Sequence, residues 1–542
     1  MRKKRSGSIE LSRRRFLGSI TSAPLLGLSA SPAAAFFSTL LAGQSQKAWA
    51  AELGIKPMNL VLMHCGGGPA HWMYGFLTAY SSEGFNRNPL VGTQFRNVGG
   101  RYVGVDYVTH SIKGIEAPTM WSHPVPAPNG GSRPMADLLD NLLCFQGIDT
   151  RNAGHGESTA WAHLSPGAKQ GATNLAGDVA GTPFSVLNLG ASDFRFKSKA
   201  SKSFVSPSLN GNAISNLLTP FAPAGSAPFR TDKAAIKAAY DGIFPLLDEL
   251  AKQGHVGAES LIQNRNSALA LVETNFADLA TVWTSLVNKY QDLITRAVTT
   301  VGLPGLNDLP IGEGGSGASA LYQVNGDPNL TLHLATDLRN SVVPGTNIGG
   351  LAARFALTEY VLTNNLCGSV AFSIGGLTGL VDPSTNRGFG IGNDQHQSGL
   401  YPITYYNILR YRGISACLLE LIEQLKAAGK WEETVIRWGG EFTRNARTDM
   451  TGADHGFRGA CYKHFSGAFK GPLVVGNLTN DGRLGWGAGG TVPELGRRAN
   501  LVDLAILLAH LLRVPPPFTS EPTVVTNTSN GFVSRIGKSR HV

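Results

Sequence analysis

The stretch NLVLMHCGGGP at residues 59–69 joins an apolar run directly to three glycines. The same arrangement recurs at residues 434–440, where TVIRW is followed by two glycines, and the apolar runs at residues 142–145, 184–189 and 369–374 also have glycine close behind them. Unbroken apolar runs bounded in this way are typical of strands that are buried on both faces. The sequence therefore predicts five buried strands, each followed by a sharp turn.

Helical patterns lie between several of these runs, and the clearest covers residues 414–428. Its leucines and isoleucines form one stripe at helical spacing, and Gly429 supplies a stop signal. Strands that alternate with helices predict an α/β fold, a three-layer sandwich around a mostly parallel sheet. In such sheets ligands bind beyond the carboxyl ends of the strands.

A different pattern covers residues from about 232 to 301. Leucines recur there at helical spacing and no strand-like run separates them. We expect a helical insertion that packs onto the α/β core, because the mixed charge of the segment does not suit a basic partner-binding helix. The glycine-rich residues 302–319 would then form a flexible return.

Residues 1–50 have the three parts of an export signal: a basic start, a diluted apolar stretch over residues 16–42 and the small-x-small end AWA at residues 48–50. SRRRFL at residues 12–17 fits the twin-arginine pattern. The sequence predicts a twin-arginine signal peptide over residues 1–50, a mature α/β domain over residues 51–542, the twin-arginine export machinery as a partner, and a periplasmic or secreted location in a bacterium. A retained membrane anchor is the alternative, but two prolines interrupt the apolar stretch.

The charge of the chain excludes several classes of partner. Residues 1–50 hold eight basic residues and one acidic residue, which leaves only +3 of the net charge of +10 for the rest. A charge this small over so long a chain predicts no nucleic-acid partner. No uninterrupted apolar run after residue 50 reaches about 18 residues, so no membrane span is expected in the mature chain.

The five cysteines are odd in number and contain no C-x-x-C pair, which argues against a zinc knuckle or a disulfide framework. The sequence also lacks C-x-x-C-H, iron–sulfur spacing and a G-x-G-x-x-G turn after a strand. An oxidoreductase or electron carrier therefore finds no support.

Histidines follow the first two predicted strands. His64 and His71 flank the three glycines, where imidazoles could ligate a metal or accept a proton, although His64 could equally be an interior histidine. His155, Ser158 and Thr159 follow the second strand, and a hydroxyl near a helix N-terminus is stabilised as an alkoxide. Capping the helix is the commoner role of such a hydroxyl.

Carboxylates and imidazoles also gather on strand-end loops of the C-terminal half. Together they offer oxygen and nitrogen ligands for a cation and a guanidinium that can clamp an anion. Glu441 and Arg444 could instead simply pair with one another. The group consists of Asp394, His396, Glu441, Arg444, Asp454 and His455.

The order of these motifs resembles a known family. A strand leading into GGGP and a histidine, a loop histidine after the second strand, Asp-x-His, a helix ending in glycine, a strand running into GGEFTR, and then Asp-His are similar to the bacterial domain-of-unknown-function family 1501. That family is often exported by the twin-arginine route and belongs to the alkaline phosphatase and sulfatase superfamily. The best match lies at residues 427–456.

The resemblance implies an alkaline phosphatase-like fold and a metal-dependent hydrolase that cleaves a small anionic phosphate or sulfate ester. It implies one or two divalent metal ions, with zinc, manganese, magnesium and calcium as candidates, and a hydroxyl or modified-cysteine nucleophile. By position, the metal ligands would be Asp394, His396, Glu441, Asp454 and His455, the substrate anion would be held by Arg444, the nucleophile candidates would be Ser158 and Thr159, and an additional site could use His64, His71 and His155.

The chain departs from the superfamily pattern in three places. His64 and Cys65 stand where an aspartate normally ends the first strand, Phe442 stands where a histidine is usual, and no C/S-x-P-x-R nucleophile motif occurs. The alternative function is therefore a catalytically silent exported protein of the same fold that binds metal or a partner.

Overall fold

The computed structural model describes residues 58–76, 94–98, 101–106, 109–151, 154–218, 249, 252, 276–299, 338–383, 385–392, 394–396, 400–446, 452–456, 458–480, 486–491, 498–518, 525–528 and 531–534. The predicted signal peptide lies outside these residues. Among the helices they contain, none combines the length and the apolar character that crossing a bilayer requires.

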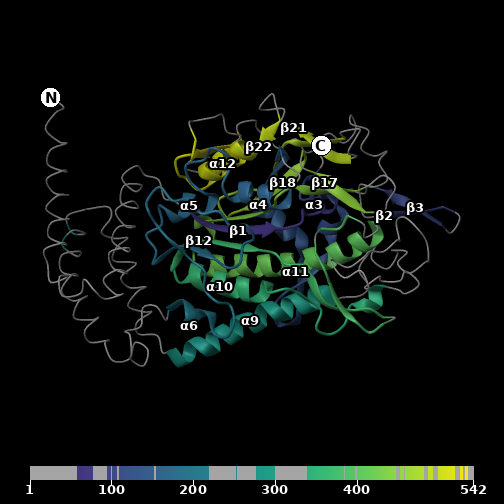
Figure 1. Cartoon of the computed structure of the whole chain (residues 1–542), viewed down its shortest axis with the longest axis horizontal. Coiled ribbons are helices and arrows are strands. Elements are labelled where there is room, and N and C mark those ends of the chain that lie inside the picture. Colours follow the sequence, from purple (N-terminus) through teal and green to yellow (C-terminus); the bar gives the residue numbers. More distant parts are fainter. Residues whose placement is uncertain are drawn as a thin grey trace.

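A nine-stranded sheet forms the centre of the molecule (Figure 1). β18 runs antiparallel to both of its neighbours, and the other pairings are parallel. In spatial order the strands are β10 (Phe204–Val205), β9 (Phe184–Asn188), β12 (Cys367–Ser373), β1 (Asn59–Cys65), β15 (Thr434–Gly440), β18 (Ala460–Phe465), β8 (Leu142–Asp149) and β19 (Leu473–Val475), with β22 (Ala499–Asn500) also pairing with β8.

The five predicted strands are all present in this sheet, as β1, β8, β9, β12 and β15. The prediction of an α/β fold with a mainly parallel central sheet is therefore confirmed. The antiparallel strand β18 was not foreseen, because its sequence, ACYKHF, places a lysine and a histidine inside the run.

Side chains of β1 alternate between two separate cores, as the pleat of a strand requires. Val61 and Met63 pack with α10 (Leu351–Thr363) and α11 (Leu400–Ala427). Leu60 and Leu62 pack with α5 (Ala172–Gly177) and α12 (Leu501–Leu511). Both faces of the sheet are thus covered, which explains why its strands read as continuous apolar runs.

Figure 1 shows the layers edge-on, with α12, α5 and α4 (His155–His163) above β1, and α11, α10 and α9 (Phe276–Thr299) below it. α9 packs on α10 and α11 and so adds a further layer on that side. It falls within the predicted helical insertion, most of whose other residues, and the predicted return over residues 302–319, lie outside the described part of the chain.

α11 ends as predicted but begins earlier. The amides of Gly429 and Lys430 bond to the carbonyls of Lys426 and Leu425, and Gly429 has φ +65°, which is the Schellman ending of a helix. The helix starts at Leu400 and not at residue 414. Buried arginines interrupt the apolar stripe before residue 414, yet they fit because their guanidinium groups bond to backbone carbonyls; Arg410, for example, donates from Nε to Gly375 O at 2.8 Å.

Short strands form small sheets outside the central one. They pair as β2 (Gln94–Val98) with β3 (Arg101–Asp106), β4 (Thr109–Ile112) with β5 (Ile115–Pro118), β6 (Pro124–Pro126) with β7 (Ser132–Pro134), β13 (Leu377–Val381) with both β11 (Asn347–Ile348) and β14 (Gly388–Ile391), β16 (Thr443–Ala446) with β17 (Ala453–Gly456), β20 (Asn477–Asn480) with β21 (Trp486–Thr491), and β23 (Val525–Thr528) with β24 (Gly531–Ser534). The remaining short helices are α3 (His71–Tyr74) and α6 (Ala213–Leu218).

Candidate metal centre

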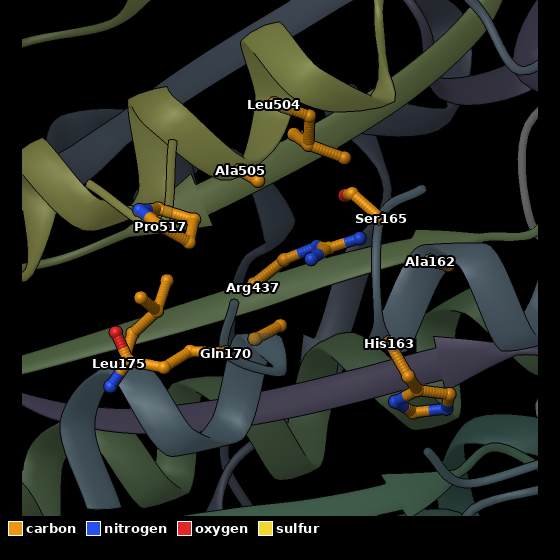
Figure 2. Close-up of a pocket in the computed structure, with 10 residues that line it drawn as sticks. Ala162, His163, Ser165, Gln170, Leu175, Arg437, Leu504, Ala505 and Pro517 are labelled. Atoms are coloured by element: carbon orange, nitrogen blue, oxygen red, sulfur yellow. The ribbon is translucent and has the colours of Figure 1, made fainter. Parts of the chain in front are cut away.

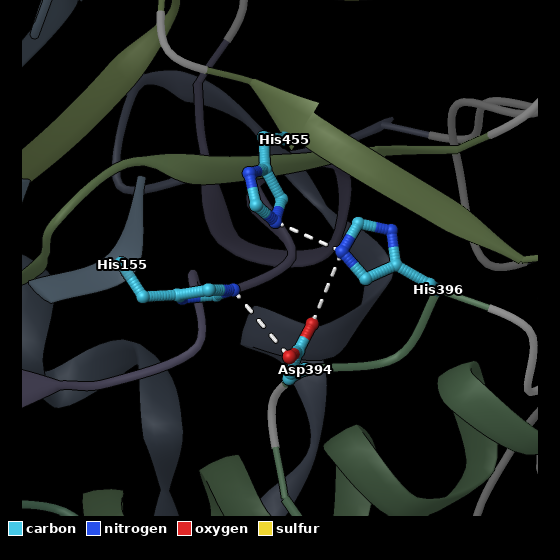
Figure 3. Close-up of side chains that lie close together, drawn as sticks. All are labelled: His155, Asp394, His396 and His455. Carbon is cyan, nitrogen blue, oxygen red and sulfur yellow. Dashed lines mark hydrogen bonds and ion pairs between the residues drawn. The ribbon is translucent and has the colours of Figure 1, made fainter. Parts of the chain in front are cut away.

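Four side chains from three distant segments converge on one point (Figure 3). His155 begins α4, in the segment that follows β8. Asp394 and His396 lie in the loop after β14, and His455 lies in β17. Each offers one ligand atom, and these four atoms all lie within 4.8 Å of one another. We call this set the four-residue centre.

Three distances between neighbouring members of the four-residue centre are close to the donor–donor spacing around a tetrahedral metal ion. His396 Nε2 lies 2.9 Å from His455 Nε2 and 3.2 Å from Asp394 Oδ1, and His155 Nε2 lies 3.4 Å from Asp394 Oδ2. Zinc–ligand bonds of about 2.0–2.1 Å in a tetrahedron put neighbouring donor atoms roughly 3.3 Å apart. Three imidazoles with one carboxylate suit zinc or a similar transition metal better than magnesium or calcium, which prefer oxygen ligands.

A carboxylate lies behind His155. Nδ1 of His155 is 3.0 Å from Glu441 Oε1, which leaves Nε2 directed at Asp394. Hydrogen bonds with Asp394 and Glu441 raise the pKa of His155 to about 9. The hydrogen bond with His155, helped by the charge of Arg444, holds the pKa of Asp394 well below its usual range. A cation bound here would replace the proton on Nε2 of His155.

His396 has the same arrangement. Its Nδ1 lies 3.5 Å from Asp454 Oδ1, and its Nε2 faces the four-residue centre. Arg444 Nη1 donates to Nε2 at 3.1 Å, so this nitrogen carries the lone pair. Burial and the charge of Arg444 lower the pKa of His396. Histidines that bind metals characteristically donate their other ring N–H to a carboxylate or carbonyl, which fixes the tautomer and the ring orientation.

Glu441 connects the loop after β15 to the loop after β1. Its Oε1 accepts from the amide of Gly67 at 2.6 Å as well as from His155, and its Oε2 lies 3.2 Å from His64 Nε2. Burial raises the pKa of this carboxyl, but hydrogen bonds with His155 and His64 outweigh it and bring the pKa of Glu441 down to about 2. Glu441 is thus an ionised, buried group (1% exposed) that orients two histidines.

Arg444 is also buried and holds the four-residue centre from one side. Its Nη2 donates to Asp394 Oδ1 at 2.5 Å and its Nε donates to Gly67 O at 2.6 Å. Gly68 allows the glycine loop to lie this close to Phe442 and Arg444. A Cβ on Gly68 would lie 2.8 Å from the ring of Phe442, and its φ of +78° is a conformation that favours glycine. The glycine run after β1 therefore serves close packing against Phe442 and Arg444.

Aromatic contacts position His455. Its ring stacks on Phe442 at a centroid distance of 4.2 Å and meets the ring of His155 edge-on at 4.6 Å. The β16–β17 hairpin sets His455 directly opposite Arg444. The Phe442 ring thus packs against a candidate ligand.

The predicted site residues lie at different distances from the four-residue centre. Asp394, His396 and His455, which the sequence analysis gives as candidate metal ligands, lie in it together with His155, which was a candidate only for an additional site. Glu441 and Asp454, predicted as ligands, lie behind His155 and His396.

The other candidates lie further from the centre. His64 is 2% exposed and contacts Glu441. Ser158 and Thr159 lie in the turn of α4 that follows His155. Both are buried, with exposed fractions of 0% and 3%. Arg444, predicted to hold a substrate anion, is engaged with Asp394, His396 and Gly67. The side chain of His71 lies outside the described residues.

The comparison with family models gives a match over residues 404–484, to the family described as "Protein of unknown function (DUF1501)". The predicted resemblance to this family is thereby confirmed for that segment. The segment contains Glu441, Arg444 and His455, whereas His155, Asp394 and His396 lie before it. No curated protein and no solved structure matches the chain.

Proposed function

We propose that the chain is a metal-dependent hydrolase of alkaline phosphatase-like fold that cleaves a phosphate or sulfate ester at the four-residue centre. The observation that carries this proposal is the convergence of three imidazoles and one carboxylate, with a further carboxylate behind each of two imidazoles. When bound there, a divalent ion would polarise the ester and activate a water molecule as the nucleophile.

The position of the centre supports a catalytic role over a structural one. β1 and β15 are neighbouring parallel strands, and β8 runs in the same direction because β18 lies between it and β15 and is antiparallel to both. The segments that carry Gly67, His155 and Glu441 follow the carboxyl ends of these three strands. Ligand sites of α/β sheets lie at this edge. His155, His396 and Asp394 are 38%, 37% and 41% exposed, so a substrate can reach them from solvent.

The residues of the chain divide the work in this proposal. His155, Asp394, His396 and His455 hold the ion, and Glu441 and Asp454 orient two of the imidazoles. Arg444 fixes one oxygen of Asp394 and thereby sets the direction of the carboxylate. Because the buried groups Glu441 and Arg444 hold His155 and Asp394 before substrate arrives, little reorganisation is needed during the reaction.

A catalytically silent metal-binding protein is the second candidate. It is favoured by the burial of Ser158 and Thr159, since a buried hydroxyl cannot attack a substrate, and by the engagement of Arg444 with the four-residue centre. This candidate shares the metal site and differs only in turnover.

Metal analysis followed by activity assays separates the two candidates. The purified mature protein should contain about one divalent ion per chain and hydrolyse aryl phosphates or aryl sulfates, with activity lost on chelation and regained with zinc or manganese. The exposed residue Glu423, on α11, provides a control, because Glu423→Gln should retain both metal and activity. Bound metal without turnover on either ester supports the silent protein, and absence of bound metal contradicts both.

We propose in addition that residues 1–50 direct export by the twin-arginine machinery to the periplasm or the medium. The SRRRFL motif and the weakly apolar segment behind it support this proposal. Replacing Arg13 and Arg14 by lysine should keep the full-length chain in the cytoplasm, and unchanged export of that variant would contradict the twin-arginine route.

A further inference from the structure

A loop at one end of the central sheet combines basic and aromatic side chains. It covers residues 194–204, FRFKSKASKSF, and leads from β9 into β10, the end strand of the sheet. We call it the basic-aromatic loop. It contains four basic residues, and the sequence has no acidic residue between positions 194 and 218. The loop therefore concentrates positive charge in a mature chain whose net charge is only +3.

The basic side chains of the loop face solvent in alternation with partly buried ones. Arg195, Lys197 and Lys199 are exposed, whereas Phe196 and Ser198 between them are only partly exposed. Lys197 Nζ donates to a backbone carbonyl at 3.0 Å, a bond that does not neutralise its charge. Within the described part of the chain, none of the three basic side chains forms an ion pair. Three positive charges are thus presented to solvent.

Three phenylalanine rings pack together beside these charges. The centroid of the Phe204 ring lies 5.3 Å from that of Phe194 and 5.0 Å from that of Phe196. Phe194 in turn meets the buried ring of His163 edge-on at 5.4 Å, which ties the group to the core. Phe204 is 42% exposed, more than any other large apolar side chain of the described residues. An apolar surface therefore lies next to the three cations.

A buried carboxylate holds the loop in shape. Asp178, which follows α5, is 3% exposed and accepts from Ser198 Oγ at 2.6 Å and from the amide of Lys199 at 2.8 Å. Gln170, which lines the small cavity in Figure 2, donates to the same carboxylate at 2.7 Å. Because these bonds order the loop in advance, a partner that docks on it loses little affinity to ordering the chain.

Lys202 adds a fourth positive charge at the base of the loop. It is partly buried, and its ammonium nitrogen makes no hydrogen bond within the described residues. Burial lowers the pKa of Lys202, and the charge of Asp178 opposes this effect. An anion held at the loop would favour the charged form of this lysine as well.

The surface of an anionic bilayer complements both features of the loop. Basic side chains are attracted to negatively charged lipid headgroups. An exposed aromatic ring gains free energy when it leaves water for the boundary between headgroups and acyl chains. A soluble acidic polymer offers the charges without this apolar boundary, so it would not account for the exposed ring of Phe204.

We propose that the basic-aromatic loop docks the protein on the surface of a phospholipid bilayer that carries anionic headgroups. Phe204 enters the headgroup boundary, and Arg195, Lys197 and Lys199 contact the headgroups. The contact is peripheral and reversible, because one ring and a few charges bury little apolar surface. This inference is independent of the metal centre and of the proposed hydrolysis.

Vesicle binding tests the proposal. The mature chain, residues 51–542, is used because residues 1–50 are themselves basic and apolar. It should sediment with vesicles of phosphatidylcholine mixed with phosphatidylglycerol and far less with vesicles of phosphatidylcholine alone, and added salt should weaken the binding. Absence of binding to the anionic vesicles at low salt, or equal binding to both kinds of vesicle, overturns the proposal.

Charge reversals locate the binding surface. Arg195→Glu and Lys199→Glu should each weaken binding to the anionic vesicles by about 10-fold or more. Both variants should keep the Tm of the unaltered chain, because neither side chain forms an ion pair within the described residues. Lys426→Glu is the matched control, since it makes the same change of charge at an exposed position on α11. A loss as large in the control would assign the binding to net charge and overturn the proposal.

Phe204→Ser separates a bilayer from a soluble acidic polymer. The variant should bind the anionic vesicles several-fold more weakly, whereas binding to dextran sulfate should be the same as for the unaltered chain, because only the bilayer offers an apolar boundary. Vesicle binding that Phe204→Ser leaves unchanged would identify a partner recognised by charge alone, such as an acidic polymer, and would overturn the proposal.

Discussion

Two groups of titratable side chains, each assembled from distant segments, are built on opposite principles. Between α9, α10 and α11, Lys289 Nζ lies 2.7 Å from Glu359 Oε2 and 3.2 Å from Glu420 Oε1. Arg133 lies 3.4 Å from Glu420, and the hydroxyl of Tyr290 donates to Glu359 at 2.6 Å. Two cations face two carboxylates, so this helix network satisfies itself.

The four-residue centre is held by hydrogen bonds among its own members and with Arg444. His396 Nε2 and His455 Nε2 lie 2.9 Å apart, so one ring donates its N–H to the other. The single carboxylate, Asp394, is shared with Arg444. The comparison separates charges that are paired across three helices from four donor groups that point at one common place, where they could serve a single ion.

The largest expected effect is the loss of a ligand. Asp394→Asn keeps the shape of the side chain and removes its charge, so bound metal should fall to a trace and hydrolysis should drop by more than about 100-fold. His455→Ala should lose the metal as well, because both residues contribute to one site. Metal content by mass spectrometry of the purified variants measures this. Retention of metal by either variant would separate the two residues and break the shared site.

Removal of one charge from the helix network should affect stability without affecting the metal. Glu359→Gln leaves Lys289, a partly buried group that is 24% exposed, without that carboxylate partner. Because Lys289 keeps Glu420 at 3.2 Å, the cost should be smaller than the roughly 3 kcal/mol of leaving a buried charge without any partner. The variant should show a lower Tm and an unchanged metal affinity. A change in metal affinity would contradict the separation of the two regions.

Glu441→Gln tests orientation apart from ligation. The amide can still accept a hydrogen bond, but it lacks the charge that fixes the Nδ1–H tautomer of His155. Metal affinity should fall by about 10-fold to 100-fold, and metal should still bind at higher concentration. Competition with a chromogenic chelator measures the shift. A complete loss of metal, equal to that of Asp394→Asn, would instead make Glu441 a ligand.

The smallest expected effect is on the pH dependence of stability and comes from His464. Its imidazole is buried in the core, whereas two imidazoles of the four-residue centre are partly exposed. Burial lowers the pKa of His464 to about 3 in the folded protein, whereas the unfolded chain has a value of about 6.5. Between these values the unfolded chain binds the additional proton, so the stability supplied by the neutral ring is present above pH 6.5 and is lost as the pH falls towards 3.

At pH 5 this loss amounts to about 2 kcal/mol. His464→Gln should therefore make the Tm less dependent on pH between 7 and 4, although its Tm at pH 7 should be lower than that of the unaltered chain. A Tm profile parallel to that of the unaltered chain would show that His464 does not contribute to acid sensitivity.

The strands of the sheet were predictable from the sequence, whereas the set of residues in the candidate metal centre was predictable only in part. Apolar runs ending in glycine located β1, β8, β9, β12 and β15, and paired ligand residues pointed to Asp394, His396 and His455. His155 was assigned to a separate site because its segment follows β8, and the order of β8, β18 and β15 in the sheet cannot be read from the chain.

The sequence by itself determined the buried strands, the carboxyl-end location of the polar loops and the chemistry that their residues can offer, because these depend on local composition and spacing. Only the tertiary structure decided which carboxylates stand beside which imidazoles. Glu441 became an orienting group and His155 a candidate ligand because separate loops must pack to atomic distances, and those distances depend on the strand order and on the rings and glycines that separate the loops.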